Sequence, residues 1–175
     1  ALLRAFAVMR CTGVPKARFG RVGDGGYVHL DDFAGLDAAI SLGIANEVSW
    51  DLAMAARGLD IYQFDNSIDR PPVAAPKFHF TRATVGRKGL SLARIIADTG
   101  VDPARTILKI DIEGAEWDLL ADAPDDLLAC FPQIICEFHA LGSDDFFLNF
   151  VARMAVLDRL NAHHRVVHIH GNNCS

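Results

Sequence analysis

Residues 108–120, LKIDIEGAEWDLL, place a run of apolar side chains directly before a group of carboxylates. The first part reads as an extended strand, in which successive side chains point to opposite faces. Charged groups are costly to bury without a partner, so a core strand should end in acids only where its end leaves the core. In a parallel sheet, the carboxyl ends of the strands border the crevice where ligands bind. The stretch therefore predicts a buried strand that ends at a functional rim and is followed by a helix.

Strands and helices alternate on both sides of this stretch. Short apolar runs predict strands, and apolar residues at helical spacing predict helices. The predicted strands are residues 38–45, 59–64, 77–86, 106–112, 133–139 and 165–171, and the predicted helices are residues 46–58, 91–100, 113–123 and 144–163. A glycine-rich turn at residues 23–26 predicts a β-hairpin before them. We expect Asn46 and Ser91 to cap the first two helices and Gly100 to end the second.

This alternation predicts an α/β fold of the Rossmann-like type, with a mostly parallel sheet and helices on both faces. A length of 175 residues suits one domain with a sizeable core. We expect a single domain over residues 1–175. Residues 1–36 would form an N-terminal helix and hairpin extension, and residues 37–175 would form the Rossmann-like core.

The composition is ordinary for a soluble globular protein, with 51% hydrophobic and 22% charged residues. A formal net charge of −5 and the absence of a Lys/Arg run argue against a nucleic-acid partner. No apolar stretch approaches the ~20 residues of a membrane span. The four cysteines show no CxxC spacing. We therefore expect them to be reduced and the protein to be cytoplasmic.

A glycine-containing turn follows the first predicted core strand, where the sequence reads SLGIANEVSWD. Gly43 lets the backbone turn tightly and approach a ligand, and the next helix offers free N–H groups. The residues expected to contact a nucleotide-like ligand here are Gly43, Ala45, Asn46 and Glu47. The pattern is not a full GxGxxG, so a close turn without a ligand explains it equally well.

Asp65 and Asn66 follow the second predicted core strand, about 20 residues after Gly43. A carboxylate at this spacing accepts the ribose hydroxyls of adenosine in dinucleotide-binding folds. An aspartate before asparagine and serine is also common turn chemistry. Together with the glycine turn, the pair predicts a ribose site.

Three acids follow the apolar part of the opening stretch. Glu116, and to a lesser extent Glu113, are explained by the preference of negative charge for a helix N-terminus. Asp111 still lies in the predicted strand, on the face of Lys109, and has no such explanation. We expect catalytic roles for Asp111 and Glu113, and contact between Asp111 and the cofactor.

Histidines and a glutamate stand at the ends of the last two predicted strands. Glu137 and His139 share one strand face, and His168 and His170 share another. Such pairs perform acid–base chemistry near neutral pH or bind a divalent metal, whereas a lone histidine there is more often structural. We expect His139 or His170 to act as a general base. The candidate metal ligands are Asp111, Glu137 and His139.

These residues resemble the FkbM-like S-adenosylmethionine-dependent methyltransferases, in the branch related to methyltransferase-like proteins. The resemblance rests on TILKIDIEGAEWDLL and extends through DGGYV, SLGIANEVSWDLAMAARG, IYQFDNSID, QIICEFH and VHIHGNN. It implies S-adenosylmethionine across the ends of the first, second and fourth core strands. On that mapping, the turn from Gly43 to Glu47 faces the methionine part and Asp65 holds the ribose. Asp111, Glu113 and the rim histidines face the methyl group and the acceptor.

The chain departs from the family's pattern at several points. Ser41 stands where the first strand often ends in an acid, and Ala45 replaces a second glycine. An adenine-contacting acid after the third strand is not evident. The fold normally adds a final antiparallel strand, which is not evident before Ser175. We expect that strand to be missing or partly compensated by the N-terminal hairpin.

The expected function is an S-adenosylmethionine-dependent O-methyltransferase that acts on a hydroxyl of a small molecule or sugar, with a divalent metal as a further candidate cofactor. The alternative is a catalytically inactive module of the same fold that binds a nucleotide or a partner. An NAD-dependent enzyme is a third reading, against which the incomplete glycine motif argues. A metal-dependent hydrolase is a fourth, and it would need a metal site without a nucleoside site. These motifs do not encode the acceptor's identity.

Overall fold

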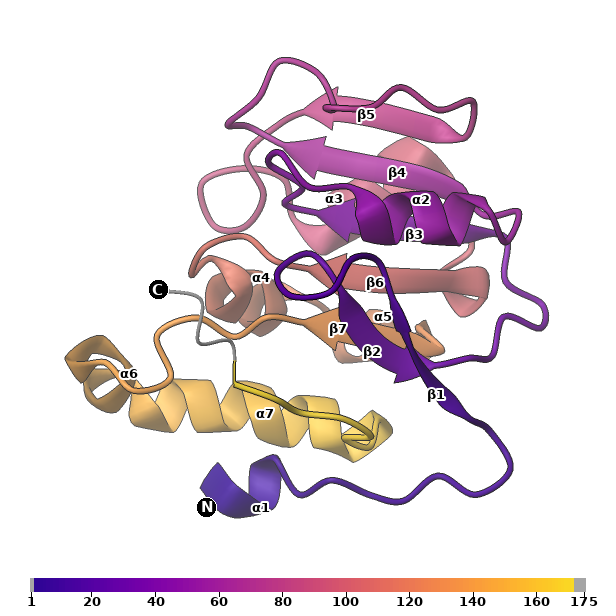
Figure 1. Ribbon diagram of the computed structural model, residues 1–175. Helices are drawn as coiled ribbons and strands as arrows, with labels where there is room; N and C mark the ends of the chain where they lie inside the picture. Colours follow the sequence, from indigo (N-terminus) through magenta and orange to yellow (C-terminus); the bar gives the residue numbers. More distant parts are fainter. Residues whose placement is uncertain (1, 172–175) are drawn as a thin grey trace.

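The computed structural model describes residues 2–171 and has a five-stranded parallel sheet at its centre (Figure 1). The strands are β3 (Ala38–Leu42), β4 (Asp60–Asp65), β5 (Phe78–Arg82), β6 (Thr106–Ile110) and β7 (Gln133–Cys136). Their order across the sheet is β5-β4-β3-β6-β7, and each neighbouring pair is parallel. The strand order reverses between β3 and β6, because β4 and β5 extend to one side and β7 to the other. The predicted Rossmann-like α/β fold is therefore confirmed.

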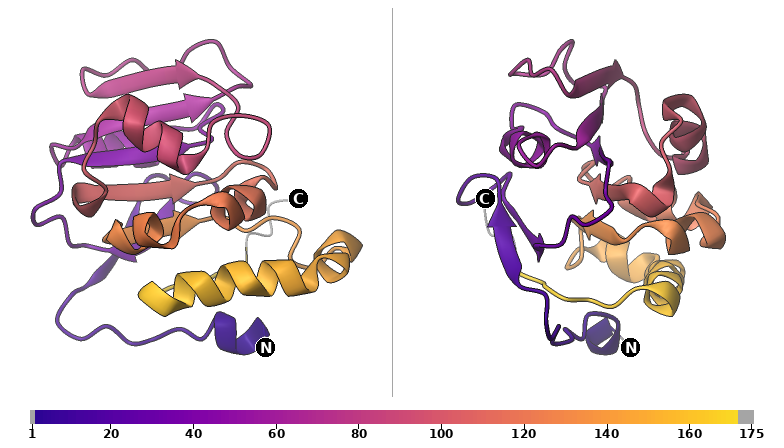
Figure 2. Two further views of the ribbon diagram at one scale, coloured as in Figure 1. Left: turned by 180° about the vertical axis from the view of Figure 1, so that it is seen from behind. Right: turned by 90° about the vertical axis from the view of Figure 1, so that its right-hand side faces the viewer.

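Helices cover both faces of this sheet (Figure 2). One face carries α2 (Ser49–Ala55) and an antiparallel hairpin of β1 (Lys16–Phe19) and β2 (Tyr27–Leu30), as the sequence predicts. The other face carries α3 (Leu92–Thr99), α4 (Glu116–Asp122), α5 (Asp125–Cys130) and α7 (Phe150–His163). The remaining helical elements are α1 (Leu2–Ala5), the 3-10 helix η1 (Pro103–Arg105) and α6 (Asp144–Leu148).

The core lies in two layers because successive strand residues face opposite sides of the sheet. Ala39 and Ile107 pack with Trp50 under α2 and the hairpin. Ile40 and Leu108, their neighbours in sequence, pack in the larger layer on the other face. All residues of β3 and β6 are buried, which explains why the two strands read as nearly continuous apolar runs.

The caps of α3 are those that the sequence predicts. The Ser91 side chain accepts a hydrogen bond from the Arg94 amide, and Gly100 ends the helix in the left-handed conformation. The cap predicted for the first core helix is wrong. That helix begins at Ser49, and Val48 instead of Asn46 occupies the cap position, without a side-chain hydrogen bond.

The helix after β6 begins later than predicted. Glu113 and Gly114 have φ angles of 54° and 102°, which lie outside the right-handed helical region. The chain therefore makes a turn before α4 starts at Glu116. Asp111 and Glu113 therefore do not share a continuous strand, although both line the same pocket.

The predicted helix at residues 144–163 is two helices, α6 and α7, which meet at Asn149. The Asn149 side chain donates to the backbone oxygen of Asp145, and such local bonds compete with a continuous helix. The short helix α5 was not predicted. Within residues 2–171, no helix is long and apolar enough to cross a membrane.

The predicted sixth strand at residues 165–171 is wrong, since this segment joins no sheet. It passes beside the N-terminal segment and β1 (Figure 2), where Met9 donates its amide to the Val166 oxygen. Lys16 donates its Nζ to the Val167 oxygen. A segment of alternating apolar residues becomes a strand only where it can pair with the edge of a neighbouring strand. The two hydrogen bonds of this segment do not form such a ladder.

Candidate functional site

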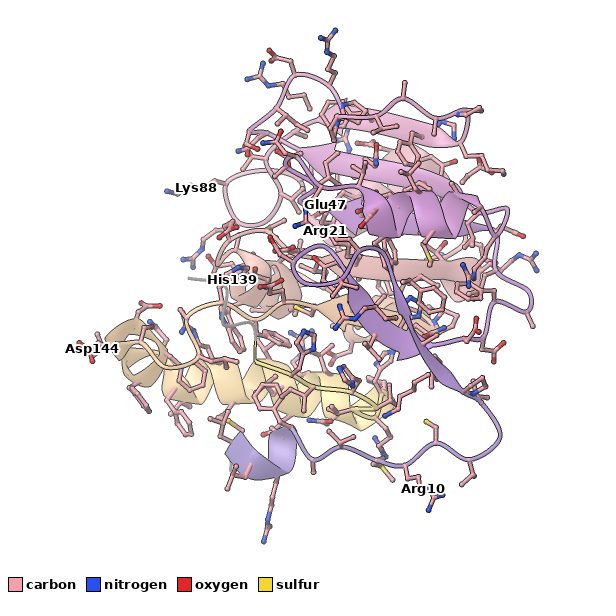
Figure 3. The ribbon with its side chains drawn as sticks, in the orientation of Figure 1. Arg10, Arg21, Glu47, Lys88, His139 and Asp144 are labelled. Carbon is pink, nitrogen blue, oxygen red and sulfur yellow. The ribbon has the colours of Figure 1, made fainter. Side chains whose placement is uncertain are left out.

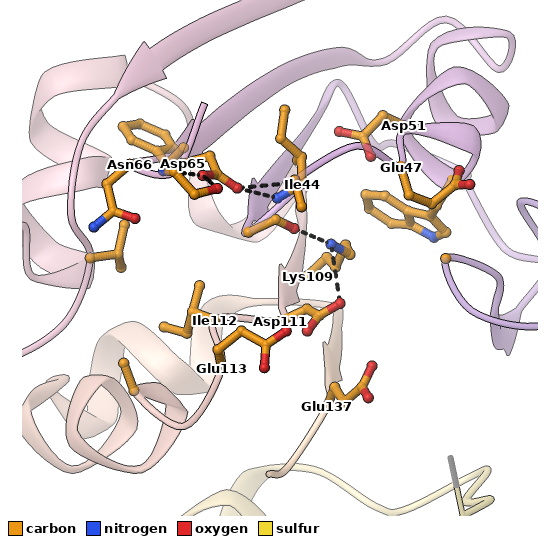
Figure 4. A pocket seen from close by; sticks show the side chains of 18 of the residues that line it. Ile44, Glu47, Asp51, Asp65, Asn66, Lys109, Asp111, Ile112, Glu113 and Glu137 are labelled. Atoms are coloured by element: carbon orange, nitrogen blue, oxygen red, sulfur yellow. Dashed lines mark hydrogen bonds and ion pairs between the residues drawn. The ribbon is translucent and has the colours of Figure 1, made fainter. Parts of the chain in front are cut away.

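A pocket of about 660 Å³ opens beyond the carboxyl ends of β3, β4 and β6 (Figure 4). This is where the strand order reverses, which is the usual ligand position in such sheets. Its volume falls within the range of small-molecule sites, roughly 300–1,000 Å³. Of the residues predicted from sequence, the pocket is lined by Gly43, Ala45, Glu47, Asp65, Asn66, Asp111, Glu113, Glu137 and His139.

The turn after β3 depends on Gly43. Its φ is 74°, and a Cβ at this position would lie 1.6 Å from the carbonyl oxygen of Asp111. The ends of β3 and β6 can therefore approach only because this residue has no side chain. Ala45 also has a positive φ, of 39°, which side chains seldom adopt. The tight turn predicted after this strand is present.

Asp65 holds this turn in place from the end of β4. Its Oδ2 accepts the amides of Ile44 and Ala45, at 2.9 and 2.8 Å. Its Oδ1 accepts the amide and the hydroxyl of Ser67, at 2.7 and 2.6 Å. Burial raises the pKa of Asp65, but these hydrogen bonds outweigh burial, so its pKa lies below the usual value. The carboxylate is thus ionised and accepts four donors from the protein itself.

A buried lysine lies beneath the turn. Lys109 is 3% exposed, and its Nζ donates to the Gly43 carbonyl at 2.6 Å and lies 4.0 Å from Asp111 Oδ2. Asp51 on α2 is also buried, and Gln63 donates to it at 2.8 Å. Burial raises the pKa of Asp51, while the Lys109 charge and the Gln63 hydrogen bond oppose the rise. The sequence identified neither Lys109 nor Asp51 as a pocket residue, although both line the pocket.

Tyr27 connects the hairpin to the acidic rim of the pocket, which consists of Asp111, Glu113 and Glu137. Its hydroxyl donates to Asp111 Oδ2 at 2.5 Å, and its ring lies under Lys109 Nζ at 5.2 Å. Burial and the adjacent Asp111 carboxylate raise the pKa of Tyr27 well above its usual range. The phenol therefore stays protonated and orients Asp111. No local sequence signal identified Tyr27, because it lies in a short strand far from β6 in the chain.

His139 is held by a carboxylate that is fully buried. The Oε1 atom of Glu116 lies 2.5 Å from His139 Nδ1 and also accepts the Ile112 amide. The other ring nitrogen, Nε2, lies 3.5 Å from Glu113 and 4.0 Å from Asp111. Burial lowers the pKa of His139, but the Glu116 hydrogen bond and charge outweigh burial and raise it. Glu116 does begin α4, as expected, and its contact with His139 is an additional role.

The hairpin loop closes one side of the pocket. Asp24 and Gly25 from this loop line the pocket, and Arg21 donates to Glu47 Oε2 at 3.0 Å (Figure 3). Glu47 Oε1 in turn accepts the Ser49 amide at 2.6 Å. The loop between β1 and β2 is thereby attached to the glycine turn, a connection that the sequence did not indicate.

Two predicted site residues are not brought to the pocket. Asn46 is exposed beside the glycine turn and is not part of the lining. His170 lies in the segment that joins no sheet, with its Nδ1 3.2 Å from His168 Nε2. Neither His168 nor His170 is among the residues that line the pocket, whereas the prediction placed them at its rim.

Comparison with known proteins agrees with this architecture. The family model described as the methyltransferase FkbM domain matches residues 39–167, which is more than half of the chain. Searches of curated proteins and of solved structures found no match. The matched range contains the glycine turn, Asp65, and the acidic ends of β6 and β7. The chain therefore belongs to the FkbM methyltransferase family.

Proposed function

We propose that this protein is an S-adenosylmethionine-dependent methyltransferase that methylates a hydroxyl oxygen of a small molecule or sugar. The main supporting observation is a single pocket at the point where the strand order reverses. It is lined by the glycine turn at Gly43, by the Asp65 carboxylate at the end of β4 and by the acidic rim. Membership of the FkbM methyltransferase family supports the reaction class.

The nucleoside side of the pocket fits a ribose. Asp65 and Asn66 both line it, and the hydroxyl donor on Asp65 Oδ1 is the Ser67 side chain. A ribose hydroxyl would replace this serine hydroxyl as the donor, while the backbone amides keep the carboxylate in position. The turn from Gly43 to Glu47 would face the methionine part of the cofactor.

The acidic side of the pocket fits a cationic methyl donor. Asp111, Glu113 and Glu137 carry their carboxylates there, and the cofactor supplies a sulfonium methyl group. Negative charge in a cleft favours binding of a cation. Transfer forms a bond from the acceptor oxygen to the methyl carbon as the carbon–sulfur bond breaks. S-adenosylhomocysteine then leaves, and the hydroxyl proton passes to a rim base.

A second candidate is a module of the same fold that binds a nucleotide or a partner without turnover. The specific observation in its favour is the Asp65 carboxylate, which already accepts four hydrogen bonds from the protein. A carboxylate has about four acceptor sites. A ribose must therefore displace Ser67 before it can bind Asp65.

Calorimetric titration with S-adenosylhomocysteine tests the proposal. We expect the wild type to bind it, and to bind NAD⁺ much more weakly. Replacing Asn66 with Ala should weaken S-adenosylhomocysteine about tenfold, which corresponds to one hydrogen bond of roughly 1.4 kcal/mol. Asn149→Ala is the matched control, since both asparagines are exposed and each donates a side-chain hydrogen bond, but Asn149 lies outside the pocket.

Absence of S-adenosylhomocysteine binding, with or without a divalent metal, would overturn the methyltransferase proposal. Binding without release of S-adenosylhomocysteine from S-adenosylmethionine, across a panel of sugars and hydroxylated small molecules, would favour the non-catalytic module instead.

A further inference from the structure

We propose that Asp111, Glu137 and His139 bind one divalent metal cation at the acidic rim. One ligand atom from each residue lies within 4.8 Å of the other two. His139 Nε2 is 4.0 Å from an Asp111 oxygen and 3.9 Å from a Glu137 oxygen. Ligand atoms stand ~2.0–2.2 Å from such a cation, so two ligands of one ion are up to about 4.4 Å apart. Both distances from His139 Nε2 to the carboxylate oxygens fall within this limit.

The two carboxylates come from rigid neighbouring elements. Asp111 directly follows β6, and its amide donates to the Leu42 oxygen at 2.9 Å. Glu137 directly follows β7, and its amide donates to the Ile110 oxygen at 2.9 Å. The parallel ladder therefore continues one residue past each strand and fixes both positions. Ligands on strand ends are placed more accurately than ligands on free loops.

The orientation of the His139 ring provides an independent observation. Glu116 is 0% exposed, and its Oε1 lies 2.5 Å from His139 Nδ1. Its Oε2 has no hydrogen-bond partner among the described residues. Nδ1 therefore faces Glu116, and Nε2 is the ring nitrogen that faces the rim, where it would coordinate a cation after losing any proton it carries. Metal-binding histidines are usually held in this way by a carboxylate.

The charges around the ring also favour a cation. Carboxylates of Asp111, Glu113 and Glu137 lie within 4.0 Å of Nε2, and that of Glu116 contacts Nδ1. The Lys109 ammonium group lies 4.0 Å from Asp111 and donates to a carbonyl. A divalent cation would reduce the mutual repulsion of these four carboxylates.

Two carboxylates and one imidazole suit a first-row divalent cation such as Mn²⁺. Its role in the reaction rests on the proposed function. Three protein ligands leave positions open, where the acceptor's hydroxyl oxygen could bind and have its pKa lowered. Such a cation would perform the activation that otherwise falls to His139 as a general base.

Titration of the metal-free full chain with Mn²⁺, followed by electron paramagnetic resonance, tests the site. We expect one bound ion in the wild type and its loss in Asp111→Asn, Glu137→Gln and His139→Asn. Glu116→Gln should lower the affinity for Mn²⁺ about 10–100-fold, because Glu116 orients the His139 ring without contacting the ion. Asp118→Asn is the matched control, since Asp118 is an exposed acid on the same helix.

An unfolding curve for each variant separates lost ligation from lost folding. Failure of the wild type to bind Mn²⁺, or unchanged binding in all three folded ligand variants, would overturn the proposal. A parallel S-adenosylhomocysteine titration in chelator keeps the two proposals distinct. If S-adenosylhomocysteine binds but Mn²⁺ does not, only the proposed metal site is rejected. If Mn²⁺ binds but S-adenosylhomocysteine does not, only the methyltransferase proposal is rejected.

Discussion

Asp65 illustrates how one side chain can match its predicted position and yet do more than predicted. Its place at the end of β4 follows from the sequence, and it lines the pocket as expected for a ribose contact. The structure adds that its Oδ2 holds the two amides of the glycine turn. Because these donors come from another strand's end, no pattern around residue 65 indicates them.

Replacing Asp65 with Asn should therefore give a pH-dependent loss of stability. The pKa of Asp65 in the folded protein lies below the unfolded value of about 3.9. Its stabilisation is thus fully present above that value and is lost as pH falls through the folded pKa. We expect the free energy of unfolding of the variant to be about 1–3 kcal/mol lower than that of the wild type near neutral pH. This difference should become smaller below about pH 4.

Urea unfolding of both proteins between about pH 3 and pH 7 measures this difference. Asp118→Asn, a change at an exposed acid, should alter the free energy of unfolding only slightly near neutral pH. If Asp65→Asn lowers the free energy of unfolding as much at about pH 3 as at about pH 7, the assigned role of the carboxylate is contradicted.

At the scale of elements, the approach of β3 to β6 depends on the turn at Gly43. A Cβ there would lie 1.6 Å from the Asp111 oxygen, whereas a Cβ on Gly58 would meet nothing within 4 Å. Both glycines have positive φ, at 74° and 93°. Gly58→Ala should therefore cost only the left-handed strain of about 1–2 kcal/mol. Gly43→Ala should cost clearly more, since it also forces two strand ends apart.

Unfolding midpoints of the two alanine variants, with S-adenosylhomocysteine titrations, provide the comparison. We expect cofactor affinity to fall in Gly43→Ala and to stay unchanged in Gly58→Ala. Equal destabilisation by the two changes would show that the close contact with Asp111 does not limit the turn.

Element boundaries show why local pattern was sufficient in some places and failed in others. Ser91 and Gly100 were assigned correctly because their caps involve bonds within one helical turn. The segment 165–171 was assigned wrongly, because a strand requires a partner edge, and its bonds are to residues near the N-terminus instead. The start of α4 was shifted by the positive φ of Glu113, which its own side chain does not favour.

At the scale of the molecule, stability depends on the two apolar layers that the central strands separate. Leu108 is 0% exposed in β6, and Leu148 is 85% exposed at the end of α6. Leu108→Ala should cost about 2–5 kcal/mol, a large part of the 5–15 kcal/mol typical of a domain. The same truncation at Leu148 should change stability by less than about 0.5 kcal/mol.

Urea denaturation of the two leucine variants checks this contrast between core and surface. A comparable loss at both positions would mean that the exposed end of α6 is covered in solution. A small loss at Leu108 would contradict the continuous core on that face of the sheet.

The sequence by itself determined the order of the five core strands and of the first three helices between them, the close turn at Gly43, and an acidic end on β6. These features follow from periodicity, caps and turn residues, which involve only neighbouring positions. Only the tertiary structure joined Tyr27 to Asp111 across 84 positions and Glu116 to His139 across 23. It also left His170 out of the pocket lining. Such contacts depend on which ends of strands and helices become neighbours when the sheet and its helices pack. The local sequence pattern does not determine these neighbours.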